Sequence, residues 1–227
     1  MQALLNALVP HRCALCGARA DAVLCPACRA ELPRNHHPCP RCALPLAAPQ
    51  AHCPDCSGQV RPYVRAVSPL RYRQPVAWLV TRLKFDGQLR LAEALAAPLL
   101  EVLTQREAPL PEVVVPVPLH PQRLRQRGFN QAMEIARPLA RRLGLVLDGT
   151  ACRRLRPTTA QTGLDAAGRR RNVAGAFAVS PRLAGRSVAL VDDVMTTGST
   201  VHAVADALCR AGVAQVEVWT AARAERA

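Results

Sequence analysis

Residues 188–208 read VALVDDVMTTGSTVHAVADAL, and the order of features in this stretch decides the fold. A short, apolar, β-branched run predicts a buried strand over 187–194, with two adjacent aspartates, Asp192 and Asp193, near its end. A helix is predicted over 200–212, with Gly212 at its C-terminal cap. Ligands gather at the carboxyl ends of parallel strands, so the aspartates mark a candidate site.

The loop between this strand and this helix has the composition of an anion cradle. Gly198 permits close backbone approach, and the N-terminus of the helix favours negative charge. Hydroxyl donors are supplied by Thr196, Thr197, Ser199 and Thr200. The P-loop pattern GxxxxGK[ST] is absent from the stretch. Because two carboxylates can accept hydrogen bonds from vicinal hydroxyls and help to hold Mg2+, acids and loop together suit a sugar phosphate.

Strand and helix patterns alternate through the rest of the chain. A buried strand is predicted over 112–118, an amphipathic helix over 130–144 and a final strand over 214–222. Pro138 could kink or split the helix that Gly144 ends. Residues 75–105 look helical in two parts, broken near 85–87, and shorter strands are predicted at 63–72, 145–149 and 175–180. This alternation predicts an α/β fold with a parallel sheet.

Eight of the ten cysteines form four CxxC pairs near the start of the chain. Two CxxC turns can complete one tetrahedral site of four sulfurs, so eight thiolates fit two structural Zn2+ ions with no open coordination position. Nearest-neighbour pairing gives one site from Cys13, Cys16, Cys25 and Cys28, and another from Cys39, Cys42, Cys53 and Cys56. The spacing leaves a crossed pairing open, and the histidines His36, His37 and His52 are second-choice ligands. Cys209 lies in the apolar helix pattern and is expected in the core.

Positive charge is concentrated in the middle of the chain. The formal net charge is +14, and residues 119–186 hold 14 arginines against three acidic residues. Such a field attracts phosphates on small molecules or on nucleic acid. Residues 118–130 are expected to form a loop at a strand's carboxyl end, where arginines suit a diphosphate, or else a basic solvated loop. This segment carries His120, Arg123, Arg125 and Arg127.

The first residues lack a basic region and a cleavage site of the secretory type, and no apolar run approaches the ~20 residues of a membrane span. We therefore expect a cytoplasmic protein without membrane insertion, whose cysteines are reduced or metal-bound. Residues 57–62 read as a linker. They divide the chain into a cysteine-rich domain over 1–60 and an α/β domain over 61–227.

The stretch VALVDDVMTTGST resembles the phosphoribosyl-pyrophosphate (PRPP) signature of type I phosphoribosyltransferases. The resemblance extends to LKFDGQLRLAEALA (83–96), VVVPVPLHPQRLRQRGFNQA (113–132) and RLRPTTAQTGLDAAGRRRNVAGAF (154–177). Together with the four CxxC pairs, these stretches are similar to the ComF family of competence and DNA-utilisation proteins over nearly the whole chain.

The resemblance implies a type I phosphoribosyltransferase sheet with helices on both faces, preceded by a double zinc ribbon. In that fold, Asp192 and Asp193 would hold the ribose hydroxyls of PRPP, and residues 196–200 its 5′-phosphate. Residues 118–130 would hold the pyrophosphate with Mg2+, and residues 153–172 would form a mobile lid. Lys84, the single lysine of the chain, lies in the LKFDG stretch and hints at a need for an ammonium group.

These features leave three functions open. The first is a Mg2+-dependent phosphoribosyltransferase whose acceptor is unidentified, because Thr196 stands where purine enzymes usually carry Asp. The second is a PRPP-sensing or single-stranded-DNA-binding module of the competence type, although Phe129 is the one aromatic residue inside the arginine-rich loop. The third is a structural partner whose zinc ribbons dock on a DNA-transport helicase.

Overall fold

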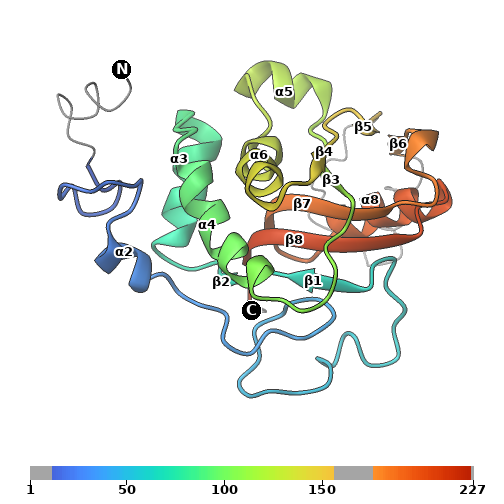
Figure 1. The fold of residues 1–227 in the computed structure, drawn as a ribbon, viewed down its shortest axis with the longest axis horizontal. Helices are drawn as coiled ribbons and strands as arrows, with labels where there is room; N and C mark the ends of the chain where they lie inside the picture. Colours follow the sequence, from blue (N-terminus) through green and yellow to red (C-terminus); the bar gives the residue numbers. More distant parts are fainter. Residues whose placement is uncertain (1–11, 156–175, 226–227) are drawn as a thin grey trace, which may run out of the picture.

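The computed structural model describes residues 12–155 and 176–225. Its centre is a parallel sheet of six strands in which β1 (Arg65–Val67), β8 (Gln215–Arg223), β7 (Ser187–Met195), β3 (Val113–Pro116) and β4 (Val146–Leu147) are neighbours in that order. Strand β2 (Leu70–Arg71) also pairs with β8. The longest pairing joins β7 and β8, from Ser187 opposite Gln215 to Met195 opposite Arg223. The α/β class with a parallel sheet is therefore confirmed (Figure 1).

Helices cover both faces of the sheet. One face contacts α4 (Leu91–Thr104) and α6 (Gln131–Leu143), with α3 (Val76–Asp86) packed on α4; the other contacts α8 (Ser199–Arg210). Side chains alternate along a strand, so Ala189 and Val191 of β7 join the first apolar layer, and Val188 and Leu190 join the second. Burial on both faces explains why β7 is a continuous apolar run.

The remaining elements of the described residues are short. They are α2 (Pro26–Ala30), α5 (Pro121–Arg127), the antiparallel pair β5 (Cys152–Arg154) and β6 (Phe177–Val179), and the 3-10 turn Pro181–Leu183. In the described ranges every helix is too short or too polar to span a bilayer.

Three details differ from the sequence predictions. Helix α6 runs through Pro138 without being split and ends at Gly144, which adopts a φ of +68°. The segment predicted as a loop over 118–130 contains the helix α5, because Pro121 is well suited to the first turn of a helix. Cys209 was wrongly expected in the core: it lies beside the buried stripe of α8 and is exposed.

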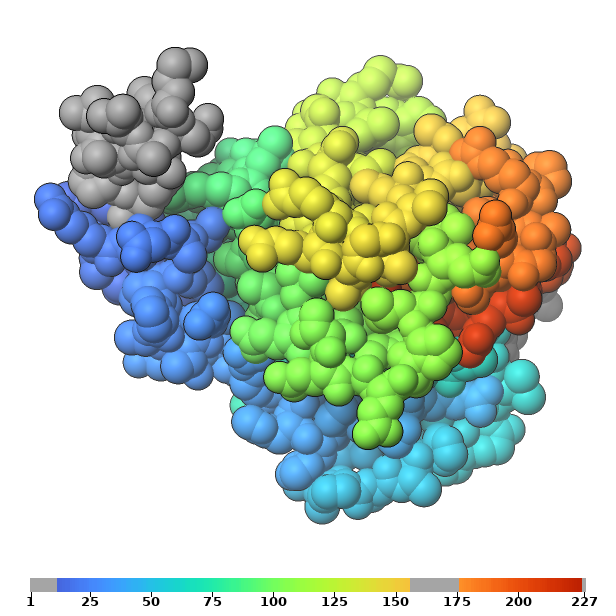
Figure 2. Space-filling model, in the orientation of Figure 1, coloured from blue at the N-terminus to red at the C-terminus, as the bar shows by residue number. Residues whose placement is uncertain are grey.

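The cysteine-rich segment packs directly against the α/β core. Leu24 and Leu32 join the apolar layer formed by α3 and α4, while Ala43 joins the layer on the opposite face of the sheet. The backbone N–H of Ala66 in β1 donates to the carbonyl of Arg41 at 2.9 Å. Figure 2 shows this blue segment in continuous contact with the green surface of the molecule.

Candidate functional site

The two adjacent aspartates lie inside β7, which continues past the predicted end to Met195. Both carboxylates are buried, with Asp192 8% exposed and Asp193 2% exposed. Because successive side chains of a strand point to opposite faces, Asp193 lies on the side of α3 and α6, and Asp192 lies on the side of α8. The pair therefore presents its carboxylates in two directions at the carboxyl end of the strand.

Asp193 has two partners from separate helices. Lys84 of α3 forms an ion pair with Oδ2 of Asp193, and Nε2 of Gln131 in α6 donates to Oδ1 at 3.2 Å. The sequence had singled out Lys84 without giving it a partner, and had not singled out Gln131, which follows the helix-capping Asn130. Three elements that are distant in the sequence thus meet at one carboxylate.

Asp192 has no cation within ion-pair distance among the described residues. Its Oδ1 accepts a hydrogen bond from the backbone N–H of Asp193 at 2.9 Å. Burial and the neighbouring Asp193 charge raise the pKa of Asp192 well above its usual range. A hydroxyl group or a metal ion supplied by a ligand would relieve this charge.

The loop after β7 has the geometry that an anion cradle requires. Gly198 is the N-cap of α8 and adopts a φ of +78°, a conformation that favours glycine. A Cβ at this position would also lie 3.4 Å from Sδ of Met195. The hydroxyl groups of Thr197 and Ser199 are hydrogen-bonded at 2.8 Å, and both side chains lie at the surface with those of Thr196 and Thr200. The start of α8 therefore lies beside exposed hydroxyl groups, and the backbone N–H of Ser199 donates to Oγ1 of Thr197 at 3.3 Å, a contact that an anion would replace.

Helix α5 places the three alternate arginines of the sequence on different faces. Residues four apart share a helix face, so Arg123 and Arg127 line one pocket, whereas Arg125 is not among its lining residues. His120 has a local partner, because its Nδ1 accepts the backbone N–H of Gln122 at 3.3 Å as the N-cap of α5. The predicted row of three loop arginines is thus replaced by a helix face carrying two.

The pocket beside α5 connects these arginines to the aspartates. Its volume is about 480 Å³, and it is lined by Lys84, Phe85, Gly87, Arg123, Gln126, Arg127, Phe129 and Gln131. None of these lining residues carries a carboxylate. Lys84 and Gln131, the two partners of Asp193, are both among them. The guanidinium carbon of Arg127 lies 5.6 Å from the centre of the Phe85 ring. The arrangement suits an anion bound next to Asp193.

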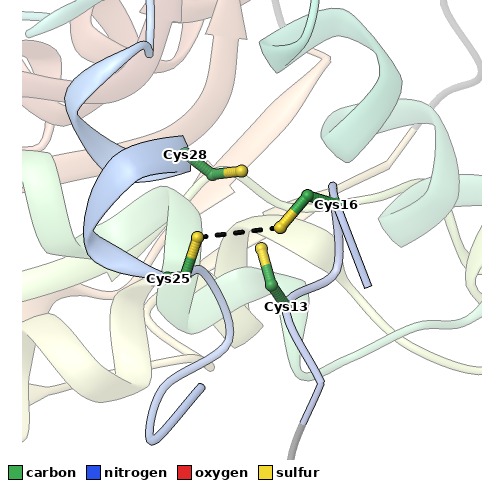
Figure 3. Close-up of side chains that lie close together, drawn as sticks. All are labelled: Cys13, Cys16, Cys25 and Cys28. Carbon is green, nitrogen blue, oxygen red and sulfur yellow. Dashed lines mark hydrogen bonds between the residues drawn. The ribbon is translucent and has the colours of Figure 1, made fainter. Parts of the chain in front are cut away.

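The eight CxxC cysteines form two clusters with the nearest-neighbour pairing. Within each cluster all Sγ atoms lie within 4.8 Å of one another. The first cluster is Cys13, Cys16, Cys25 and Cys28, whose sulfurs converge in Figure 3; the second is Cys39, Cys42, Cys53 and Cys56. Crossed pairing is excluded, and the three histidines named as second choices belong to neither cluster.

The sulfur geometry fits tetrahedral zinc. Zn–S bonds of about 2.3 Å place two ligand sulfurs about 3.8 Å apart, and the structure has 3.7 Å between Cys16 and Cys25 and 3.5 Å between Cys42 and Cys53. Four thiolates with no oxygen ligand select zinc or an iron–sulfur cluster, and the closed tetrahedron of two CxxC turns is the structural zinc type. The molecule therefore has two zinc-binding sites of four cysteines each.

One thiol in each site is prepared for metal binding by the backbone. Burial is the largest single influence on Cys13 and would raise its pKa, but backbone hydrogen bonds from Cys16, Cys25 and Leu15 together lower that pKa to about 6. At Cys39, burial is likewise outweighed only by the combined hydrogen bonds from Cys42, Cys53 and Arg41, and the pKa falls to about 7. Thiolates are the form that binds zinc, so these turns favour the ligand state.

Of the predicted lid over 153–172, Arg153 and Arg154 belong to β5, Leu155 follows the strand, and the part from 156 onward lies outside the described residues.

Comparisons with known proteins match both parts of the chain. Residues 4–57 match the double zinc ribbon domain, and residues 130–226 match the phosphoribosyl transferase domain. The DNA utilization protein YhgH of Salmonella typhi is 39% identical over 95% of this chain and 98% of its own length. Competence protein F of Haemophilus influenzae is 34% identical over 88% of this chain and 90% of its own. Competence protein ComFC of Bacillus subtilis is 27% identical over 86% and 82%, respectively. The fold is thus of the phosphoribosyltransferase type, preceded by a double zinc ribbon.

Proposed function

Because this chain belongs to the ComF family of competence and DNA-utilisation proteins, we propose that it binds PRPP with Mg2+ and transfers the phosphoribosyl group in DNA uptake or utilisation. One observation carries the proposal. Asp192, a buried carboxylate with no paired cation among the described residues, lies at the end of a parallel strand, directly before the exposed loop over 196–200. A ligand with a phosphate and neighbouring hydroxyl groups would donate hydrogen bonds to Asp192 through its hydroxyls and bind the loop through its phosphate.

Each part of PRPP has a matching part of the site. The 5′-phosphate would bind the N–H groups at the start of α8 and the loop hydroxyls, with Gly198 allowing close approach. The ribose hydroxyls would donate to Asp192 and Asp193. The pyrophosphate would lie in the pocket beside α5, where Arg123 and Arg127 supply planar donors and Lys84 supplies an ammonium. His120 and Arg125 would border this region from the same helix.

The residues present fit Mg2+ carried by the substrate. Mg2+ is usually held by one or two carboxylates together with substrate phosphates, and Asp192 and Asp193 are two such carboxylates. When bound, the ion would neutralise charge on the pyrophosphate. Lys84 keeps Asp193 paired without the ligand, so ligand binding must share or replace this ion pair.

Transfer would be a displacement at C1 of the ribose. The acceptor forms a bond to C1 while the bond from C1 to the pyrophosphate oxygen breaks, and the electron pair leaves with pyrophosphate. The protein would hold PRPP in line and stabilise the departing charge through Arg123, Arg127 and Lys84. No side chain needs to form a covalent intermediate.

The test is calorimetric titration of PRPP with Mg2+ into zinc-loaded protein. Asp192→Asn should weaken binding about 100-fold, because it replaces a charged hydrogen-bond acceptor of the ribose. The fold should tolerate this change, since an amide removes a buried charge for which the described residues supply no cation. Asp206→Asn removes a carboxylate paired with Arg210 on the exposed face of α8 and serves as the control. Wild-type protein that binds no PRPP, or a variant that binds equally well, would contradict the proposal.

Turnover is tested separately by release of pyrophosphate from bound PRPP with nucleobases, nucleosides and single-stranded DNA as acceptors. Binding without release under every acceptor would reduce the proposal to PRPP sensing.

A second candidate function, binding of single-stranded nucleic acid, is favoured by one surface. On α3, Trp78 and Arg82 stack with the guanidinium carbon 5.2 Å from the ring centre, and Phe85 is 74% exposed beneath Arg127. Aromatic rings beside arginines are what single-strand binders use for bases and phosphates. Phe85→Ala should weaken binding of a labelled oligothymidine about tenfold, while Val146→Ala on the edge strand β4 should not. Binding that does not weaken with salt would argue against phosphate contacts.

The division into a zinc-ribbon domain over 1–60 and a phosphoribosyltransferase-like domain over 61–227 is proposed with this function, as is a cytoplasmic location. Zinc sites built from cysteines alone need thiols that stay reduced, which supports that compartment. Docking of the ribbons on a DNA-transport helicase would be compatible with either activity, and co-purification of the two proteins would test it.

A further inference from the structure

The guanidinium of Arg223 joins two parts of the molecule that no motif connects. Arg223 ends β8 and is 7% exposed. It lies between the second four-cysteine site and the loop over 196–200, which we call the phosphate loop. Its Nε donates to the carbonyl of the zinc ligand Cys42 at 3.2 Å. Its Nη1 donates to the carbonyl of Met195 at 2.8 Å and to that of Thr196. One side chain therefore holds both the metal-binding turn and the first residues of the loop.

The positive charge of Arg223 also favours a negatively charged zinc site beside it. A buried cation is costly unless it is paired, and among the described residues no carboxylate lies within ion-pair distance of Arg223. Four thiolates around Zn2+ carry a net charge of about −2. Metal loading thus supplies the negative charge next to the guanidinium, and it fixes the Cys42 carbonyl that accepts its hydrogen bond.

We propose that zinc in the second four-cysteine site positions the phosphate loop through Arg223. Arg223 acts as a positioning residue, because it donates to carbonyls and occupies none of the N–H groups of the loop. The consequence for ligand affinity rests on the function proposed above. The coupling between zinc and loop geometry does not, and it can be measured without any ligand.

Coupling of this kind is reciprocal. If zinc raises the affinity of the loop for a phosphate ligand, the bound ligand must raise the affinity of the second site for zinc by the same factor. The first four-cysteine site provides the internal control, since no hydrogen bond among the described residues joins it to the loop.

The first experiment measures hydrogen exchange in the peptide covering residues 195–202 of zinc-loaded protein. Arg223→Lys keeps the charge but replaces the fork with a single ammonium, which cannot reproduce contacts made from both Nε and Nη1. We expect exchange in this peptide to become about tenfold faster while zinc content stays at two per chain. Arg106→Lys changes another largely buried arginine, paired with Glu217 near the opposite end of β8, and should leave the peptide unchanged. Wild-type exchange in Arg223→Lys would overturn the proposal.

The second experiment follows zinc loss to a chelator, with alkylation of the released thiols and peptide mass spectrometry to assign each site. PRPP with Mg2+ should slow alkylation of Cys39 and Cys53 about tenfold in wild type, leave Cys13 and Cys25 unaffected, and have no effect in Arg223→Lys. Equal protection of both sites would overturn the coupling. If wild type binds no PRPP, the proposed function fails, and the exchange experiment still decides the coupling.

Discussion

The two four-cysteine sites share one motif and differ in their surroundings. In the first, Cys16 is exposed and Cys25 and Cys28 are partly exposed; in the second, all four cysteines are buried. The first site packs on α3 and α4 through Leu24 and Leu32. The second is tied by hydrogen bonds to β1 and to the end of β8. The same metal chemistry thus stabilises a segment on the outside of the helices at the first site and a part of the buried core next to the sheet at the second.

The largest difference between the sites should follow loss of one ligand. A structural zinc site contributes on the order of 10 kcal/mol, comparable to the whole stability of a domain. Cys53→Ser should therefore unfold the α/β core, because the second site is part of its packing. Cys16→Ser should unfold only the segment that packs outside α3 and α4. Near-UV circular dichroism, which reports the environment of the buried Trp219, distinguishes the two. Equal loss of signal in both variants would break the comparison.

The order in which the two four-cysteine sites release zinc should sharpen the comparison between them. A chelator reaches a metal through exposed ligands, so the first site should lose zinc in a fast phase and the second in a phase about 100-fold slower, limited by opening of the core. A colorimetric zinc indicator measures both phases. A single phase that releases two zinc ions together would mean that the sites open as one unit.

The sequence predicts such features where its pattern is strong and local. The eight zinc ligands and the strand β7 are predicted correctly because four CxxC pairs and a continuous apolar run are strong local signals, although the spacing leaves the pairing of the cysteines to the structure. Nothing local distinguishes the two metal sites, since their burial depends on how the later sheet packs over them. The ion pair of Lys84 with Asp193 was equally out of reach, because it depends on the placement of α3 relative to β7.

Helix α5 illustrates a different limit. Three arginines at alternate positions suggest a basic loop, whereas the capping by His120 and Pro121 favours a short helix that separates them onto different faces. The partners of the short strands β5 and β6 could not be assigned either, because a three-residue strand carries too few side chains to fix a register.

A moderate effect is expected at the connection between the sites. Asn35 is buried, and its Nδ2 donates to the carbonyl of Ala43 at 2.8 Å and to that of Ser68 at 3.1 Å. Asn35→Ala would leave both carbonyls without this donor and should cost about 2 kcal/mol, or roughly 4–8 °C in melting temperature. Differential scanning calorimetry measures the shift. His36→Ala, at the exposed neighbouring position, is the control and should leave the temperature unchanged.

The smallest effect is expected at the edge of the first site. Nη1 of Arg12 donates to the carbonyl of Gly17 at 3.0 Å on the exposed surface of the CxxC turn. Arg12→Ala should change the free energy of unfolding by less than about 0.5 kcal/mol, because water replaces an exposed hydrogen bond. Chemical denaturation of zinc-loaded protein provides the measurement. A larger loss would mean that the first site is more strongly coupled to the core than its exposure indicates.

The place of β8 in the sheet has a consequence for how the molecule is made. This strand comes last in the chain order, yet it lies between β1 and β7. During synthesis both cysteine clusters leave the ribosome and can take up zinc long before residues 215–223 exist. The sheet closes only when β8 inserts, and Arg223 then arrives as its final residue. The contact between Cys42 and the phosphate loop is therefore completed only after residues 215–223 have been made, so a chain that stops before them holds metal without an assembled site.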